Sequence, residues 1–254
     1  MSKLTFTGKI LLISAFSLLL VGCGKQIKNS DALLKKSVDL ALNNGKWEKA
    51  LDYAKRAAKL DTNNVDAQIM IAICMDKNGD SDEAAKQLRN VILSTPNNFL
   101  AEISLGKILY CSQKYEEAYE HLANAYNLNN NSIEALSLYA ECSGNILAKT
   151  TQELYVKLLN MEQVSNKFEI YNNLGVYFAN SQNYSMAFSS FMNAYRLSPK
   201  SPIIVANLGI FKDSYQSDSK QAKFFYRKFI SITRGNSAFD EQSKFFSSRL
   251  KDLR

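Results

Sequence analysis

The sequence predicts an all-α protein in which about six pairs of helices stack as a solenoid and a last helix caps the stack. Two columns of small residues recur about every 34 residues, and the composition is poor in helix breakers. The 254 residues are 46% apolar but include only 3 prolines and 10 glycines, which favours a folded, helix-rich chain. A fixed period of this length is typical of arrays in which each unit packs on its neighbours.

The first 22 residues have the features of a signal peptide. Lys3 and Lys9 are their only charges, and the stretch from Ile10 to Val21 is apolar except for small serines. It is too short to span a bilayer, which takes about 20 residues, but it has the length of the apolar core of a secretion signal. A buried N-terminal helix is the alternative, for which the repeats leave no packing partner. We therefore expect residues 1–22 to be a signal peptide.

The segment Leu20-Val21-Gly22-Cys23 resembles the lipobox of bacterial lipoproteins, in which small residues precede a cysteine that receives a lipid before the signal is cut. The resemblance implies a diacylglyceryl group on Cys23 and no other cofactor. Two or more acyl chains, such as palmitate, anchor a protein stably. A chance cysteine near an ordinary cleavage site is the alternative. With Gly24 rather than aspartate next, the resemblance implies the outer membrane, facing the periplasm, in a cell with two membranes.

Residues 23–30 are then expected to be a short tether, which places the following array close to the bacterial envelope membrane. The first column of the array lies just after each expected turn and has spacings of 34, 34, 69 and 35 residues: Ala50, Ala84, Ala118, Ala187 and Ala222. The long gap contains one repeat in which Gln152 lies near the alanine position. The second column has spacings of 34, 34, 35 and 34 residues: Ala72, Gly106, Ala140, Gly175 and Gly209. Small residues at both positions let paired helices approach closely.

These columns resemble the tetratricopeptide repeat family. The match extends to aromatic residues after the turn and prolines that close a repeat: Trp47, Tyr115, Tyr184, Pro96 and Pro199. The resemblance implies a right-handed solenoid over residues 31–235, with repeats at 31–64, 65–98, 99–132, 133–167, 168–201 and 202–235. In the fourth repeat, Ser143-Gly144-Asn145 predicts an early end to the first helix and an irregular start to the second.

Residues 236–254 predict one more helix. Phe239, Phe245, Phe246 and Leu250 can share one stripe of it, with charged residues on the other side. Repeat arrays need a terminal helix with a polar outer face, so we expect a cap here. A partner-binding helix is the alternative.

The family resemblance also implies a concave groove that binds a peptide or a partner helix. The groove positions of a repeat are its second, fifth, sixth, ninth, twelfth and thirteenth residues. In the second and third repeats they hold the apolar residues Ile69, Met70, Ile73, Leu100, Ile103 and Tyr110. In the fifth and sixth repeats they hold the amides Asn172, Asn173 and Asn207, which can pair with the backbone of an extended peptide. Core packing is an equally good interpretation of the apolar set, and asparagine is frequent at its position whatever a repeat binds.

Residues typical of catalysis are missing from the pattern. The sequence has no GxSxG, HExxH, Walker A or Rossmann motif. His121 is the only histidine, with no acid or nucleophile at catalytic spacing, and is expected to pack or to face solvent on the second helix. We therefore expect no enzyme and no metal site.

The cysteines of the array are Cys74, Cys111 and Cys142. They form no CxxC motif and are expected to be buried and reduced, with a disulfide as the alternative. The pair of Cys74 and Cys142 is excluded, because the two lie at the same position two repeats apart.

The net charge is +7, but no run of five or six like charges occurs, which argues against nucleic acid as a partner. The sequence thus predicts a membrane-anchored scaffold or adaptor that binds another protein or peptide. Envelope, pilus and secretion machinery are the processes suggested by bacterial lipoproteins of similar design. The alternative is a structural envelope lipoprotein that associates with copies of itself as a homo-oligomer.

Overall fold

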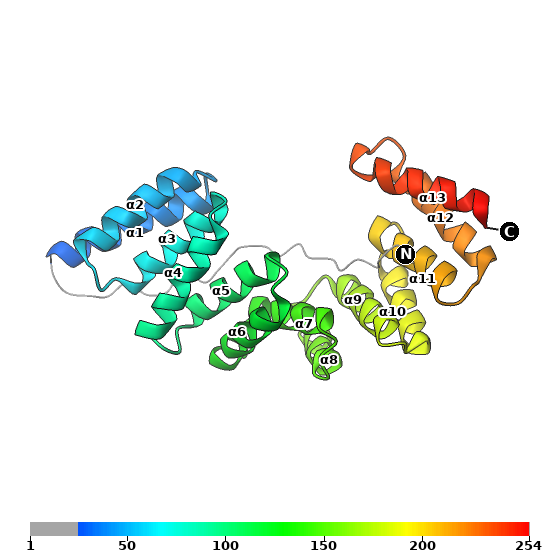
Figure 1. The fold of residues 1–254 in the computed structure, drawn as a ribbon, viewed down its shortest axis with the longest axis horizontal. Helices are drawn as coiled ribbons and strands as arrows, with labels where there is room; N and C mark the ends of the chain where they lie inside the picture. Colours follow the sequence, from blue (N-terminus) through cyan, green and yellow to red (C-terminus); the bar gives the residue numbers. More distant parts are fainter. Residues whose placement is uncertain (1–24, 254) are drawn as a thin grey trace. The chain divides into compact units, whose positions relative to one another are not determined.

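The computed structural model describes residues 25–253 (Figure 1), which form thirteen α-helices and one short 3₁₀ helix, with no strand in this range. The predicted all-α helical repeat fold is confirmed. The signal peptide expected at residues 1–22 and the lipid expected on Cys23 lie outside the described residues. Among the described helices, none has the length and apolar character needed to cross a bilayer.

The chain forms two compact units that divide between Cys142 and Ser143, inside α7 (Ile133–Asn145). The first unit also contains α1 (Lys25–Leu42), α2 (Trp47–Leu60), α3 (Val65–Lys77), α4 (Ser81–Ser94), α5 (Phe99–Cys111) and α6 (Tyr115–Leu128). The second unit also contains α8 (Thr151–Asn160), α9 (Lys167–Asn180), α10 (Tyr184–Leu197), α11 (Pro202–Ser214), α12 (Ser219–Thr233), η1 (Ser237–Phe239) and α13 (Asp240–Asp252).

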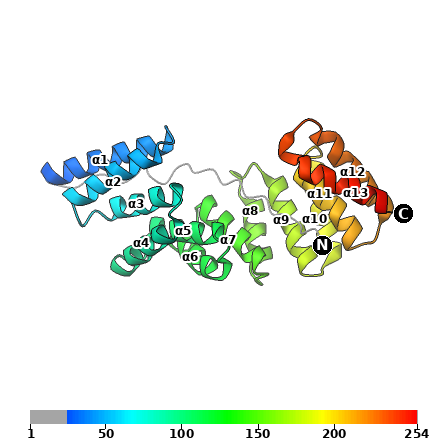
Figure 2. The same ribbon diagram turned by 45° about the horizontal axis from the view of Figure 1, so that its top comes forward.

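Successive helices pair as hairpins within each unit, as the pairs α5 with α6 and α9 with α10 show in Figures 1 and 2. Several first helices begin at a side chain that accepts a bond from a free backbone N–H. The Asn64 and Asn98 side chains accept from the backbone N–H groups of Ala67 and Ala101, both at 2.9 Å. Such caps stabilise a helix by about 1 kcal/mol each. The starts of α3 and α5 therefore follow from local sequence.

Both columns of small residues lie between paired helices. The five alanines of the first column are fully buried. In the second column, a Cβ atom at Gly106 would lie 2.7 Å from Leu122 Cγ, and one at Gly175 would lie 2.5 Å from Phe191 Cδ1. Both distances are below the contact distance of two carbon atoms. The glycines are thus required by the close approach of the helices rather than by their backbone freedom.

The start of the array differs from expectation, because α1 begins at Lys25. The prediction of a tether over residues 23–30 is therefore wrong for residues 25–30, which are helical. Ser30 explains part of the difference: it is buried, and its hydroxyl donates to the Ala57 carbonyl oxygen at 2.9 Å while accepting from Asn64 Nδ2 at 3.0 Å. The packing of α1 against α2 extends the helix toward the N-terminus.

The fourth repeat differs from expectation in its first helix. The helix α7 continues through Ser143, Gly144 and Asn145 and has 13 residues, as α3 and α5 have, so the expected early end is wrong. The irregular second helix is confirmed, since α8 has only 10 residues where α6 and α10 have 14. Leu147 precedes it with a φ of 53°. The irregularity lies in this connection, at the end where the second unit begins.

The last helix, α13, packs on α12 through aromatic contacts. Phe246 is buried, with its ring centroid 4.5 Å from that of Tyr226 and 4.9 Å from that of Phe229. Arg249 donates two hydrogen bonds to the Asp213 carboxylate of α11, at 2.7 and 2.9 Å. Phe245 of the expected stripe stays 47% exposed. α13 thus covers the last helix pair with Phe246 as its main apolar contact.

Candidate partner-binding surfaces

The apolar groove residues expected in the second and third repeats divide into two groups. Ile69, Met70 and Ile103 are buried in the core of the first unit. Their assignment to an accessible groove is wrong, because the neighbouring helices cover them. Ile73, Leu100 and Tyr110 are only half buried and pack on the edge of the same core. These three can still contact a partner without unfolding the array.

Three charged residues accompany the half-buried apolar ones: Lys107 and Glu134 are half buried, and Glu141 is buried. Lys107 of α5 forms an ion pair with Glu134 of α7, with Nζ 3.1 Å from Oε1. The Tyr110 hydroxyl donates to Glu141 Oε2 at 3.4 Å. The sequence analysis did not select Lys107, Glu134 and Glu141 as groove residues. They nevertheless lie at the second or ninth positions of their repeats, which are among the groove positions of the family. We call the combined set the first-helix surface: Ile73, Leu100, Lys107, Tyr110, Glu134 and Glu141.

The first-helix surface combines apolar area with paired charges. The side chains of Lys107 and Glu134 are 20% and 29% exposed, so their ion pair is partly shielded from water and fixes α5 against α7. Such a surface offers a partner apolar contacts beside a partly exposed ion pair in a defined position.

The asparagines expected to bind a peptide are buried in the second unit. Asn172, Asn173 and Asn207 are all at most 2% exposed. Asn207 Nδ2 donates to Asn172 Oδ1 at 2.9 Å, and Asn172 Nδ2 donates to Asn173 Oδ1 at 3.4 Å. Buried amides need such partners. The peptide-binding assignment is therefore wrong for the side chains as they lie, because all three are buried and Asn207 joins α11 to Asn172 of α9.

A hollow of about 330 Å³ lies between α11 and α13 in the second unit. Its walls come from groove positions of the sixth repeat, including Ile203 and Ile210, and from aromatic residues of the cap, including Phe245 and Phe246. The cap therefore closes part of the groove at this repeat. Asn207 is one wall residue, but its side chain is fully buried.

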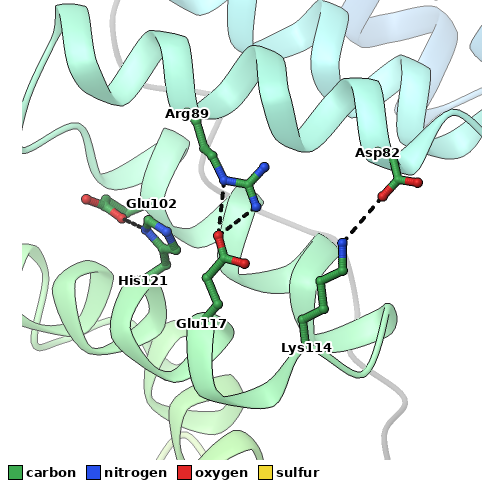
Figure 3. A network of polar contacts seen from close by, with 6 residues as sticks. All are labelled: Asp82, Arg89, Glu102, Lys114, Glu117 and His121. Carbon is green, nitrogen blue, oxygen red and sulfur yellow. Dashed lines mark hydrogen bonds and ion pairs between the residues drawn. The ribbon is translucent and has the colours of Figure 1, made fainter.

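A polar network joins the helices of the second and third repeats (Figure 3). Arg89 of α4 donates two bonds to Glu117 Oε1 of α6, at 3.0 and 2.6 Å, and Lys114 Nζ lies 3.5 Å from Asp82 Oδ1. His121 Nδ1 lies 2.6 Å from Glu102 Oε2. Sequence reasoning had identified no acid partner for His121, because Glu102 lies on another helix. The packing role expected for His121 fits this partly buried contact.

The three cysteines of the array are free. Cys74 and Cys142 are buried, and burial raises the pKa of their thiols to about 11 and about 12, so both stay protonated at neutral pH. Cys111 is exposed, which differs from the expectation that all three are buried. Within residues 25–253, no group of three or more His, Cys, Asp and Glu side chains could hold a metal ion.

Comparison with known proteins supports the repeat geometry described above. Two segments, residues 41–103 and residues 168–201, match models of the tetratricopeptide repeat. The chain contains tetratricopeptide repeats. Proteins built from tetratricopeptide repeats are typically non-catalytic scaffolds for other proteins. No curated protein matches the sequence.

Solved structures of tetratricopeptide repeat type show the same fold. The PilF structure from Pseudomonas aeruginosa is 16% identical and has a TM-score of 0.66, over 89% of this chain and 100% of that one. A repeat protein from Cytophaga hutchinsonii is 16% identical with a TM-score of 0.61, over 89% and 88% of the two chains. PilW, described as a widely conserved type IV pilus biogenesis factor, is 15% identical with a TM-score of 0.58, over 75% and 93%.

Proposed function

We propose that this chain is a lipid-anchored adaptor of the bacterial cell envelope that binds a partner protein or peptide through the first-helix surface. The observation that carries the proposal is the grouping of Ile73, Leu100 and Tyr110, half buried, beside the ion pair of Lys107 and Glu134. Apolar side chains that stay partly exposed next to fixed charges are typical of recognition surfaces. The tetratricopeptide repeats support a role in protein binding.

The process in which the adaptor acts is proposed by analogy. PilW carries the description of a pilus biogenesis factor and shares this fold at 15% identity. Likeness at this identity extends to the fold alone, but it makes assembly of pilus or secretion machinery the first process to test. The resemblance of residues 20–23 to a lipobox supports a membrane site, and Gly24 supports the outer membrane, facing the periplasm, where a second membrane exists.

The partner-binding role is tested with a charge on the first-helix surface. We expect Ile73→Lys to abolish capture of the partner from envelope extracts, because a partner would have to bury the added ammonium group. Leu93→Lys is the matched control: it adds the same charge at an 80% exposed position of α4 and should leave capture intact. Circular dichroism should show the same helix content in both variants. Equal capture by the two variants would contradict the proposal.

The lipid anchor is tested by labelling cells with palmitate. The wild type and Cys111→Ser should incorporate the label, whereas Cys23→Ser should not, because the acyl chains depend on the thiol at position 23. Intact mass should place the first residue of the mature wild type at Cys23. Label in Cys23→Ser at the wild-type level would refute the anchor.

The alternative of self-association is separated by light scattering. A monomer over a wide range of protein concentrations leaves the adaptor role standing, whereas a stable homo-oligomer whose formation Ile73→Lys prevents would assign the first-helix surface to copies of the chain.

A further inference from the structure

The excess positive charge of the chain lies in its second half. Residues 143–254 contain 15 Lys and Arg against 8 Asp and Glu, whereas residues 1–142 contain 16 of each. Within the second half, the second helices α10 and α12 contain five basic residues and no acidic one. A comparable helix of the first unit, α6, has three glutamates and no Lys or Arg. The positive charge is therefore concentrated on particular helices.

One face of α12 presents these charges to solvent together with an aromatic ring. Lys220, Phe224, Arg227 and Arg234 are exposed and Lys223 is half buried. The spacing of three, four or seven residues places Lys220, Lys223, Phe224 and Arg227 along one side of the helix. Arg234 follows directly after the end of α12 at Thr233. We call these five residues the α12 face. The opposite side of the helix is buried in the unit through Ala222, Phe225, Tyr226 and Phe229.

The cations of the α12 face are not neutralised by neighbouring acids. Within residues 25–253, none of the ion pairs includes Lys220, Lys223, Arg227 or Arg234. Two nearby acids in the sequence are engaged elsewhere. Asp218 caps the start of α12 by accepting from the Gln221 N–H at 3.0 Å, and Asp213 binds Arg249 and Tyr226.

Phe224 is the second unusual feature of this face. It is 56% exposed, and its outward ring lies among cations. An exposed phenyl ring beside Lys and Arg can enter the interfacial layer of a bilayer while the cations meet anionic head groups. The neighbouring helix α10 packs on α12 through Tyr195, which contacts Phe225 and binds Lys228, and the next residue, Arg196, is exposed.

We propose that the α12 face docks on the surface of an anionic lipid bilayer. A bilayer fits better than an acidic polypeptide because the face is one side of a single helix. The hollow of this unit lies between α11 and α13 and includes none of the five residues. This contact is separate from the lipid proposed on Cys23 and does not depend on it.

The test measures contact between the α12 face and lipid in the full chain. A tryptophan is introduced by Phe224→Trp, and its emission is followed with vesicles of brominated phosphatidylcholine, with or without phosphatidylglycerol. Leu93→Trp is the control, because Leu93 is exposed on α4 in the first unit, and the native Trp47 gives the same background in both. We expect quenching for Phe224→Trp only with phosphatidylglycerol, and its loss in about 1 M salt, where the Debye length falls to about 3 Å.

A charge series provides the matched comparison. In a Cys23→Ser, Phe224→Trp background, the triple variant Lys220→Gln, Arg227→Gln, Arg234→Gln should weaken binding to anionic vesicles by about two orders of magnitude, because each cation near such a surface contributes about a factor of ten or less. The triple variant Lys49→Gln, Lys55→Gln, Lys59→Gln in the same background removes the same charge from exposed positions of α2 and should bind like the parent.

Several outcomes would overturn the proposal. In the first, anionic vesicles do not quench the emission of the Phe224→Trp variant. In the second, neutral vesicles quench it equally. In the third, the two triple variants lose equal affinity for anionic vesicles. Displacement from the vesicles by soluble polyglutamate at a lower charge concentration would assign the face to an acidic polypeptide instead. A chain without the lipid on Cys23 would lose its binding to neutral vesicles but keep the quenching by anionic ones, so failure of the anchor is distinguishable.

Discussion

The glycines of the repeat mark positions where a single methyl group decides whether two helices can pair. Gly175 lies under the ring of Phe191, which is itself fully buried. The ring is also rigid, unlike the flexible end of a long side chain. Position 175 therefore tolerates an added methyl group less well than the burial of Phe191 alone would indicate.

We expect Gly175→Ala to lower the free energy of unfolding by about 1–3 kcal/mol, the range for overpacking of a core, although alanine is the better helix former. Ser189→Ala is the control, because Ser189 is exposed on α10 of the same repeat. Urea unfolding followed by circular dichroism measures both. A Gly175→Ala variant as stable as Ser189→Ala would mean that Phe191 adjusts without cost.

Single residues also show where sequence reasoning stops. The period identifies the face on which Ile69, Asn172 and Asn207 lie, but a period cannot tell how far the next helix covers that face. All three are buried for this reason. The contact of Glu102 with His121 was likewise beyond reach, because it depends on how α5 and α6 pack. What local sequence does determine is the cap and the turn, as at Asn64 and Asn98.

The carboxylate of Asp213 in α11 binds α13 through Arg249. Asp213 accepts from Arg249 and from the Tyr226 hydroxyl, and the hydrogen bond from Arg249 is the main reason why the pKa of Asp213 is lowered from its ordinary value of 3.8. A carboxyl whose pKa is lowered by folding stabilises the fold fully above its unfolded pKa. This stabilisation is lost as the pH falls through the lowered pKa.

We expect Arg249→Gln to cost about 1 kcal/mol of unfolding free energy at neutral pH, a small value because the guanidinium is 41% exposed. The difference from wild type should shrink as the pH falls below 3.8, since protonated Asp213 no longer attracts Arg249. Urea unfolding at a series of pH values measures this difference. Arg196→Gln, at an exposed position of α10, should show no such pH dependence, and a constant difference for Arg249→Gln would contradict the role of Asp213.

The elements of the array were predictable where the small-residue columns are intact. The helices α3, α5 and α11 begin at Val65, Phe99 and Pro202, the first residues of the expected repeats. In α8 the alanine of the column is replaced by Gln152, so the sequence predicted an irregular helix here but gave no signal for its length of 10 residues. The early start of α1 depends on packing of Ser30 against α2, which the periodicity does not include.

At the scale of the whole molecule, two compact units give two places where unfolding can start. Repeat arrays are stabilised mainly by contacts between neighbours, so a local change need not affect distant repeats equally. Trp47 is the only tryptophan and lies in the first unit, whereas circular dichroism averages over all helices. The two signals therefore report on different parts of the chain.

We expect Gly175→Ala to shift the unfolding midpoint seen by circular dichroism more than the midpoint seen by Trp47 fluorescence. Gly106→Ala, in the first unit, should shift the Trp47 midpoint strongly, because Leu122 blocks the added methyl group. Urea titrations with both probes on the same samples provide the comparison. Coincident shifts of both probes in both variants would show that the chain unfolds as one cooperative unit.

The exposure of Cys111 has a practical consequence. It follows Tyr110 of the first-helix surface directly, and among the described cysteines it alone is exposed, since Cys74 and Cys142 are buried with raised pKa values. In a Cys23→Ser background, a maleimide reagent should therefore modify position 111 selectively. A photoactivatable group placed there would form a covalent bond with whatever contacts the surface and let mass spectrometry identify it. The chain thus supplies its own attachment point for finding its partner.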